Sequence, residues 1–163
     1  MALTAQGEAQ AGALAGRLAG RAFALVLTSP RTRARETARL AGFPHAEVEP
    51  DLAEWDYGDL EGRTTDDIRA ELPGWTIWSG PVPGGETAEA VRARCDRLLT
   101  RLRIVEGDAL LFSHGHLLRT LAARWIGLDV VDGSRLGLDT ATVSRLGHER
   151  ETPVVSLWNE RAD

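Results

Sequence analysis

Two short apolar runs stand out along the chain, at residues 23–28 and 108–113. Continuous apolar runs of this length are typical of strands that are covered on both faces of a sheet. Each run is followed by turn residues and then by apolar positions at helical spacing, which predicts helices over residues 32–41 and 117–126. The chain therefore contains two strand–turn–helix units of the same design.

Helical spacing predicts three further helices, over residues 3–20, 65–72 and 87–103. The last of these has one apolar stripe, and we expect Cys95 to lie in it as a core residue. The other positions of that helix predict a solvated face that consists of Arg92, Arg94, Arg97 and Arg101.

The remaining segments complete an α/β pattern. Residues 45–64 are typical of a short strand followed by a structured loop, and residues 73–85 of a loop that packs onto the protein. Residues 142–149 and 153–158 predict two strands joined by a tight turn. Strands that alternate with helices indicate a sheet covered on both faces, with this antiparallel pair at one edge. We expect a single domain over residues 1–163.

Composition narrows the classes of function. The chain has 24 acidic and 19 basic residues, a formal charge of −5, and no lysine, so that every basic residue is arginine. A lysine Schiff base and a Walker-type phosphate site are excluded. The acidic balance argues against nucleic acid as a partner, and no apolar run is long enough to span a membrane.

The single cysteine allows no internal disulfide. Glu8 and Arg17 interrupt the region where a signal peptide would have its apolar core, so we expect a cytoplasmic protein.

Cationic side chains follow both predicted buried strands. Ligands of open α/β sheets bind at the carboxyl ends of the strands, where helix N-termini favour anions. This pattern favours a phosphate, although a solvated helix face would explain the arginines and a capping or core role would explain His114. A metal is less favoured, because His114 and His116 have no further ligand nearby. The residues concerned are Arg31, Arg33, Arg35, His114, Gly115, His116 and Arg119.

Residues 51–62 mix carboxylates with Trp55 and Tyr57. Such a loop can hold one carboxyl group in a partly apolar pocket, where its pKa rises toward a value useful for proton donation. The spacing does not identify which carboxyl, and most loop carboxylates are simply solvated. Together with Trp75 and Trp78, these aromatic residues fit either a substrate pocket or core packing.

In its dispersed motifs the chain resembles the histidine phosphatase superfamily, which has the phosphoglycerate mutase-like fold. The resemblance is greatest to the branch of broad acid phosphatases and sugar-bisphosphatases. It implies a three-layer, mostly parallel sheet with helices on both faces. The motifs that carry it are residues 3–7, 28–38, 54–62, 84–87 and 113–119.

The resemblance also implies roles for individual residues. Arg33 would clamp phosphate oxygens, and His114 would donate to the phosphoryl group together with the Gly115 amide. Glu54 would protonate the leaving oxygen, and Tyr57 would lie on the substrate side. The implied reaction transfers a phosphoryl group from a small phosphorylated substrate to a histidine and then to water, without a metal or other cofactor.

One part of the family pattern is missing from these residues. The family's nucleophile lies in an Arg-His-Gly motif at the end of a first strand, upstream of the motif at residues 3–7. None of the chain's histidines (45, 114, 116 and 148) has this context. We therefore expect an N-terminally incomplete domain whose reading frame starts further upstream. We also expect the missing strand to be central, so that both buried strands have unpaired backbone groups.

Two other functions stay open. A chain without the nucleophile could be a non-catalytic phosphoester-binding protein that still holds anions through Arg33 and His114. A phosphoglycerate mutase is less favoured, since residues 63–78 offer only Arg63 and Arg69 as further cations. The terminal strand pair leaves an edge that a second copy could cover in a homo-oligomer.

Overall fold

Three parallel strands form the central sheet of the computed structural model, which describes residues 2–162. They are β1 (Leu25–Thr28), β2 (Glu47–Val48) and β3 (Ala109–Phe112), in the order β2-β1-β3. β1 and β3 pair in register from Leu25–Ala109 to Thr28–Phe112, so the two predicted buried strands end side by side.

This direct pairing corrects one expectation. We expected both buried strands to have unpaired edges, but β1 is hydrogen-bonded to a strand on each side. Within residues 2–162, β2 and β3 are the edge strands of this sheet, because each pairs only with β1.

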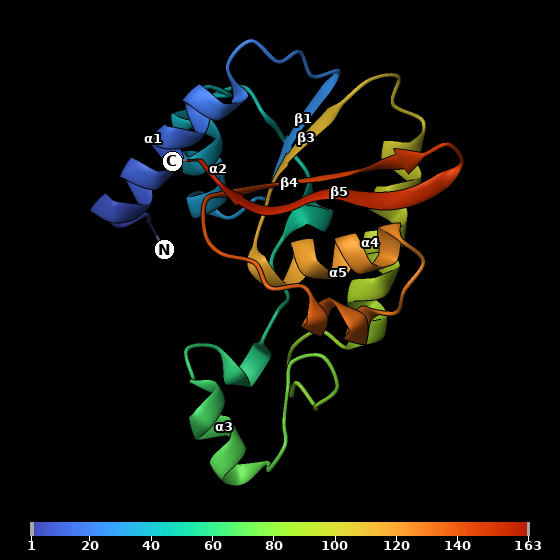
Figure 1. Ribbon diagram of the computed structural model, residues 1–163. Helices are drawn as coiled ribbons and strands as arrows, with labels where there is room; N and C mark the ends of the chain where they lie inside the picture. Colours follow the sequence, from blue (N-terminus) through green and yellow to red (C-terminus); the bar gives the residue numbers. More distant parts are fainter. Residues whose placement is uncertain (1, 163) are drawn as a thin grey trace.

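Helices cover both faces of the sheet, as predicted (Figure 1). Alternate strand residues point to opposite faces. On one face Val26, Leu110 and Phe112 pack against α1 (Ala5–Leu18) and α2 (Thr32–Leu40). On the other face Leu27 and Leu111 pack against α4 (Ala88–Arg103) and α5 (Gly115–Trp125). The result is the three-layer α/β architecture.

Helix α5 begins two residues earlier than the apolar spacing predicted. We expected this helix over residues 117–126, but His114 is the N-cap residue and Gly115 is the first helical residue. The physical reason lies elsewhere in the chain, because Glu54 accepts the backbone N–H groups of His116 and Leu117. A carboxylate at this position satisfies donors that a helix N-terminus leaves free.

Part of the segment between β2 and α4 forms a lobe that projects away from the sheet and contains α3 (Thr65–Glu71) (Figure 1). Trp55, Trp75 and Trp78 are all buried, and the rings of Trp55 and Trp78 meet edge to face, 5.7 Å apart. These three tryptophans therefore take part in packing, and the loop over residues 73–85 packs down as predicted.

The last two strands, β4 (Thr142–Glu149) and β5 (Thr152–Arg161), pair antiparallel but form a sheet of their own. We expected this pair at an edge of the main sheet. Instead, side chains anchor it to the helices: Trp125 of α5 donates to the Gly147 carbonyl, 3.0 Å away, and Arg17 of α1 pairs with Glu160.

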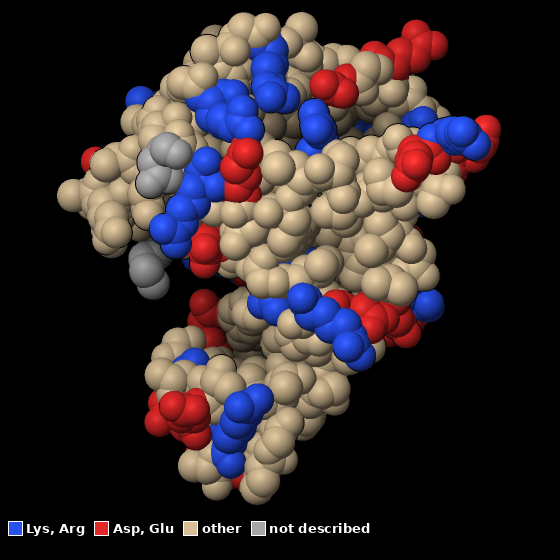
Figure 2. Space-filling view, viewed as in Figure 1, with Lys and Arg blue, Asp and Glu red and all other residues tan. Residues whose placement is uncertain are grey.

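Acidic and basic side chains are interspersed on the face of the molecule that Figure 2 shows. In the part of the chain that the structure describes, no helix combines the length and the apolar character needed to cross a membrane.

Candidate active site

Arg33 and His114 meet at the joined ends of β1 and β3. Arg33 lies in the first turn of α2. Ser113 alone separates His114 from the end of β3. Because Thr28 and Phe112 are paired at the ends of the two strands, the residues that follow them are brought together. The Arg33 Nε donates to Nδ1 of His114 at 3.1 Å.

This contact defines the protonation of the imidazole. A guanidinium nitrogen can only donate, so Nδ1 accepts and the proton of neutral His114 resides on Nε2. Nε2 in turn lies 2.7 Å from Oγ of Ser29 and donates to it. Burial lowers the pKa of His114 to about 4, with further lowering by the charges of Arg33, Arg31 and Arg94. His114 is therefore a neutral donor at pH 7.

Gly115 occupies the exposed first position of α5. A Cβ atom built on it would meet nothing within 4 Å, so no neighbouring protein atom requires a glycine there. The space beside its backbone is open at the positive end of the helix dipole, which is favourable for an anion.

Glu54 is the buried carboxylate of the acidic and aromatic loop, with 8% of its surface exposed. Three backbone N–H groups bind its two oxygens. Oε1 accepts the N–H groups of Trp55 (2.9 Å) and Leu117 (3.0 Å), and Oε2 accepts that of His116 (3.3 Å). These bonds fix the carboxylate at the first turn of α5, whose N-cap residue is His114.

Tyr57 lies beside this carboxylate and hydrogen-bonds to His116, with 2.7 Å between its hydroxyl and Nδ1. Burial raises the pKa of Tyr57, and the carboxylates of Glu54 and Glu61 raise it further. Burial lowers the pKa of His116. Both rings are therefore neutral at pH 7. The Trp78 ring packs against that of His116, with the two centroids 5.3 Å apart.

The structure adds residues that the sequence reasoning missed. Ser29 is not among the predicted site residues, although it directly follows β1 and hydrogen-bonds to His114. Arg94 was assigned to the solvated face of α4 but is buried. A signal was present, since Val91, Arg94, Cys95 and Leu98 follow the i, i+3, i+4, i+7 pattern of the core stripe.

Two other predictions concern metal and thiol chemistry. No group of three or more His, Cys, Asp or Glu side chains within residues 2–162 is arranged to hold a metal ion. Cys95 is fully buried in the core, as predicted, and burial raises the pKa of its thiol to about 12. A thiol in this state is not a nucleophile at neutral pH.

Comparison with known proteins agrees with these features. The sequence pattern of the histidine phosphatase superfamily (branch 1) matches residues 1–161. An acid phosphatase from Mycobacterium tuberculosis is 41% identical over 138 residues, which are 82% of this chain and 68% of the relative. A sedoheptulose 1,7-bisphosphatase from Saccharomyces cerevisiae is 36% identical over 132 residues, which are 64% of this chain and 48% of the relative.

A solved structure has the same fold. It is the product of an open reading frame of Mycobacterium tuberculosis, superposes with a TM-score of 0.94 and is 35% identical in sequence. The match covers 99% of this chain and 86% of that structure.

Proposed function

Because the chain belongs to the histidine phosphatase superfamily, we propose that it is a metal-independent hydrolase of phosphomonoesters, of the acid or sugar-phosphate type. The observation that carries the proposal is the contact of Arg33 with His114 at the joined ends of β1 and β3. A guanidinium, a neutral imidazole donor and the Gly115 amide at the start of α5 form a site suited to a phosphoryl group.

In this proposal Arg33 clamps two phosphoryl oxygens, and the Gly115 amide donates to one of them. His114 has one proton to give, on Nε2, which it donates to Ser29 in the unliganded site. When the substrate binds, a phosphoryl oxygen replaces Ser29 as the acceptor of this hydrogen bond. Once the phosphoryl group is bound, these donors stabilise the charge that develops in transfer.

Glu54 is proposed to be the proton donor for the leaving oxygen. Oε1 already accepts two N–H groups, whereas Oε2 accepts the longer contact from His116. Oε2 is therefore the oxygen with capacity to carry and release the proton. Tyr57, neutral and next to the carboxylate, would face the leaving group of the substrate.

The reaction then has two halves. A histidine nitrogen forms a bond to phosphorus while the ester P–O bond breaks, and Glu54 protonates the departing oxygen. Glu54, now ionised, takes a proton from water, whose oxygen bonds to phosphorus as the phosphohistidine bond breaks. The resemblance implies a nucleophilic histidine in an Arg-His-Gly motif, and none of the histidines of these 163 residues lies in that motif.

The alternative function is a phosphoester-binding protein without catalysis, which would hold anions through Arg33 and His114. Phosphoglycerate mutation is less well supported. Its extra phosphate would need the cations of the lobe, but Arg63 pairs with Glu71, 2.6 Å away, and the Arg69 Nε donates to the Trp75 carbonyl at 2.8 Å.

Turnover of p-nitrophenyl phosphate at mildly acidic pH separates the two main functions. We expect no turnover by the 163-residue chain and turnover by a chain extended upstream to an in-frame Arg-His-Gly. The upstream DNA must encode that motif within a few dozen codons. If the 163-residue chain is active and the activity survives His114→Ala, both functions are wrong.

A further inference from the structure

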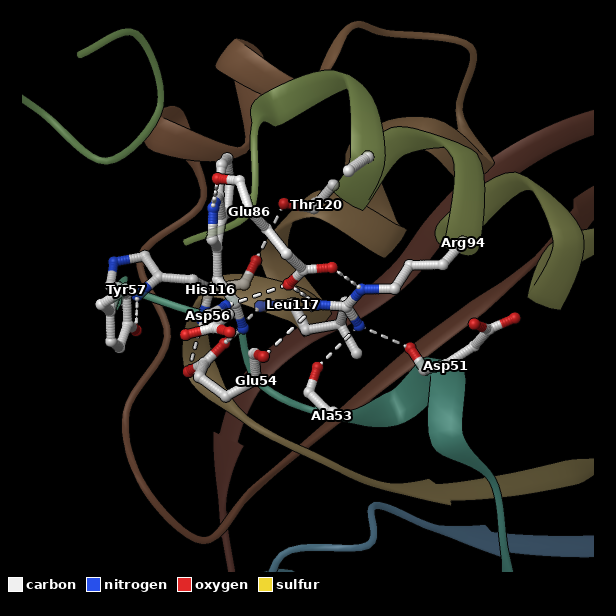
Figure 3. A network of polar contacts seen from close by, with 12 residues as sticks. Asp51, Ala53, Glu54, Asp56, Tyr57, Glu86, Arg94, His116, Leu117 and Thr120 are labelled. Carbon is white, nitrogen blue, oxygen red and sulfur yellow. Dashed lines mark hydrogen bonds and ion pairs between the residues drawn. The ribbon is translucent and has the colours of Figure 1, made fainter. Parts of the chain in front are cut away.

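The mechanism above does not use Arg94, yet this residue is one of the most completely bonded side chains in the molecule. It lies on α4, and its side chain is only 8% exposed. Nε and Nη2 each donate to the Glu86 carboxylate at 2.7 Å, in a bidentate pair. Figure 3 shows this pair beside Glu54 and the first turn of α5. A buried pair of this kind needs its remaining donors satisfied.

The remaining donors of Arg94 all go to one short segment of backbone. Nη1 donates to the carbonyls of Asp51 (2.8 Å) and Ala53 (2.7 Å), and Nη2 donates to that of Glu54 (3.3 Å). The guanidinium thus fixes the main chain immediately before Glu54 and at Glu54 itself.

Glu86 holds the same segment from the other side. Its carboxylate accepts the N–H of Asp56 at 3.0 Å, and its own N–H donates to the Asp56 carbonyl at 2.9 Å. Its carbonyl accepts the indole N–H of Trp55, also at 2.9 Å. Backbone on both sides of Glu54 is therefore bound to the Arg94–Glu86 pair.

From this fixed segment the Glu54 side chain reaches the N–H groups of His116 and Leu117. We propose that Arg94 is a positioning residue: together with Glu86 it holds the Glu54 carboxylate against the N-terminus of α5. This proposal rests on the proposed role of Glu54 as proton donor. A displacement of about 1 Å at such a group is enough to reduce a rate by two orders of magnitude.

Arg94→Lys is the first test variant, because lysine keeps the charge but cannot form the bidentate pair or reach all three carbonyls. Glu86→Gln is the second, since it keeps the shape of the side chain and weakens the pair from the other partner. Arg97→Lys is the matched control. Arg97 is also on α4, but its side chain is 63% exposed and it bonds to the carboxylate of Asp51 rather than to backbone.

The position of the carboxylate can be measured in the 163-residue chain without activity. A hydrogen bond to a carboxylate moves an amide proton downfield, so the Leu117 amide in the wild type should lie downfield of its position in Glu54→Ala. We expect Arg94→Lys to move this resonance most of the way to the Glu54→Ala value and Glu86→Gln to move it part of the way. We expect Arg97→Lys to leave it unchanged.

The proposal is wrong if folded Arg94→Lys leaves the Leu117 amide at its wild-type position. Should Arg94→Lys not fold, Glu86→Gln decides in the same way. Resonances of β1 and β3 report whether each variant keeps the native sheet.

The second measurement compares kcat/KM for two kinds of ester in the upstream-extended chain. If Arg94 only stabilised the fold, its substitution would not change the ratio of the two values. A proton donor matters most for esters with poor leaving groups. We expect Arg94→Lys to lower kcat/KM for alkyl phosphates by about 10²-fold, within the range of general acid catalysis, and to affect p-nitrophenyl phosphate much less. An equal loss for both esters would overturn the proposal.

The variant Glu54→Gln distinguishes a failure of the proposed role of Glu54 from a failure of the proposed role of Arg94. If this variant loses alkyl and aryl activity equally, the proposed role of Glu54 is wrong, and the amide measurement alone judges whether Arg94 positions the carboxylate. If Glu54→Gln is selective for alkyl esters and Arg94→Lys is not, Arg94 does not act through Glu54.

Discussion

Arg33 Nε donates a hydrogen bond of 3.1 Å to Nδ1 of His114, and this bond determines the protonation state of the imidazole. The guanidinium orients the ring, fixes its proton on Nε2 and disfavours a second proton. A phosphate that enters the site would bring the opposite charge and compete for the same donors.

The low pKa of His114 predicts how stability depends on pH. The unfolded state takes up a proton near the ordinary value of 6.5, whereas the folded state does so only near 4. As the pH falls between these values, the unfolded state binds more protons, and the free energy of unfolding decreases. The loss from this one group is on the order of 3 kcal/mol over the window.

Urea unfolding at several pH values between 7.5 and 4.5 measures this loss. His114→Asn cannot titrate, so its free energy of unfolding should decrease less steeply with falling pH than that of the wild type. Equal slopes for the two proteins would show that His114 is not held neutral by the fold.

Removal of Arg33 should raise the pKa of His114. Burial is the largest cause of the lowered pKa and the charge of Arg33 is the next, so Arg33→Ala should move the pKa upward but leave it below 6.5. Arg35, an exposed residue two positions along α2, offers the control Arg35→Ala. Titration of the ring by NMR measures the pKa, and a fall or no change in Arg33→Ala would contradict the assigned contact.

Cys95 should be unreactive in the native protein. Its thiol is fully buried and its pKa is raised to about 12, so the thiolate that reacts with alkylating agents is scarce at pH 8. We expect iodoacetamide to modify the chain only at denaturant concentrations that unfold it. Modification in buffer at a rate similar to that of free cysteine would mean that α4 is not packed as described.

Gly58 should be far less replaceable than Gly62. Both have positive φ, 52° and 80°, so alanine costs about 1 to 2 kcal/mol at either position. A Cβ at Gly58 would also collide with backbone atoms of Pro83 and Gly85, whereas one at Gly62 would meet nothing within 4 Å.

Thermal or urea unfolding should therefore show Gly58→Ala to be less stable than Gly62→Ala by at least about 2 kcal/mol, since backbone cannot yield as a flexible side chain can. Similar stabilities of the two variants would mean that the loops at 58 and 83–85 do not pack against each other.

The sequence predicted those features that depend on local pattern. Buried strands and the helices after them are recognised from short apolar runs and spacing, and parallel strands place their carboxyl ends together. The proximity of Arg33 and His114 could therefore be expected, whereas their roles in phosphate binding and transfer stay predictions.

Features that depend on long-range partners could not be predicted. Glu54 bonds to N–H groups 62 and 63 residues later, and the early start of α5 follows from that contact. Arg94 is buried because backbone carbonyls 40 to 43 residues earlier accept its protons. Carbonyls have no sequence signature, so an arginine in a core stripe could not be distinguished from a solvated one.

Titration of the ¹⁵N-labelled 163-residue chain with inorganic phosphate tests the central claim most directly, because both the catalytic and the binding-only function require the same pocket. We predict saturable shifts at the Gly115 amide and the His114 ring, an upward move of the His114 pKa, and loss of all three in Arg33→Ala but not in Arg35→Ala. Shifts that are absent, or that survive in Arg33→Ala, would contradict a phosphate site at the joined ends of β1 and β3.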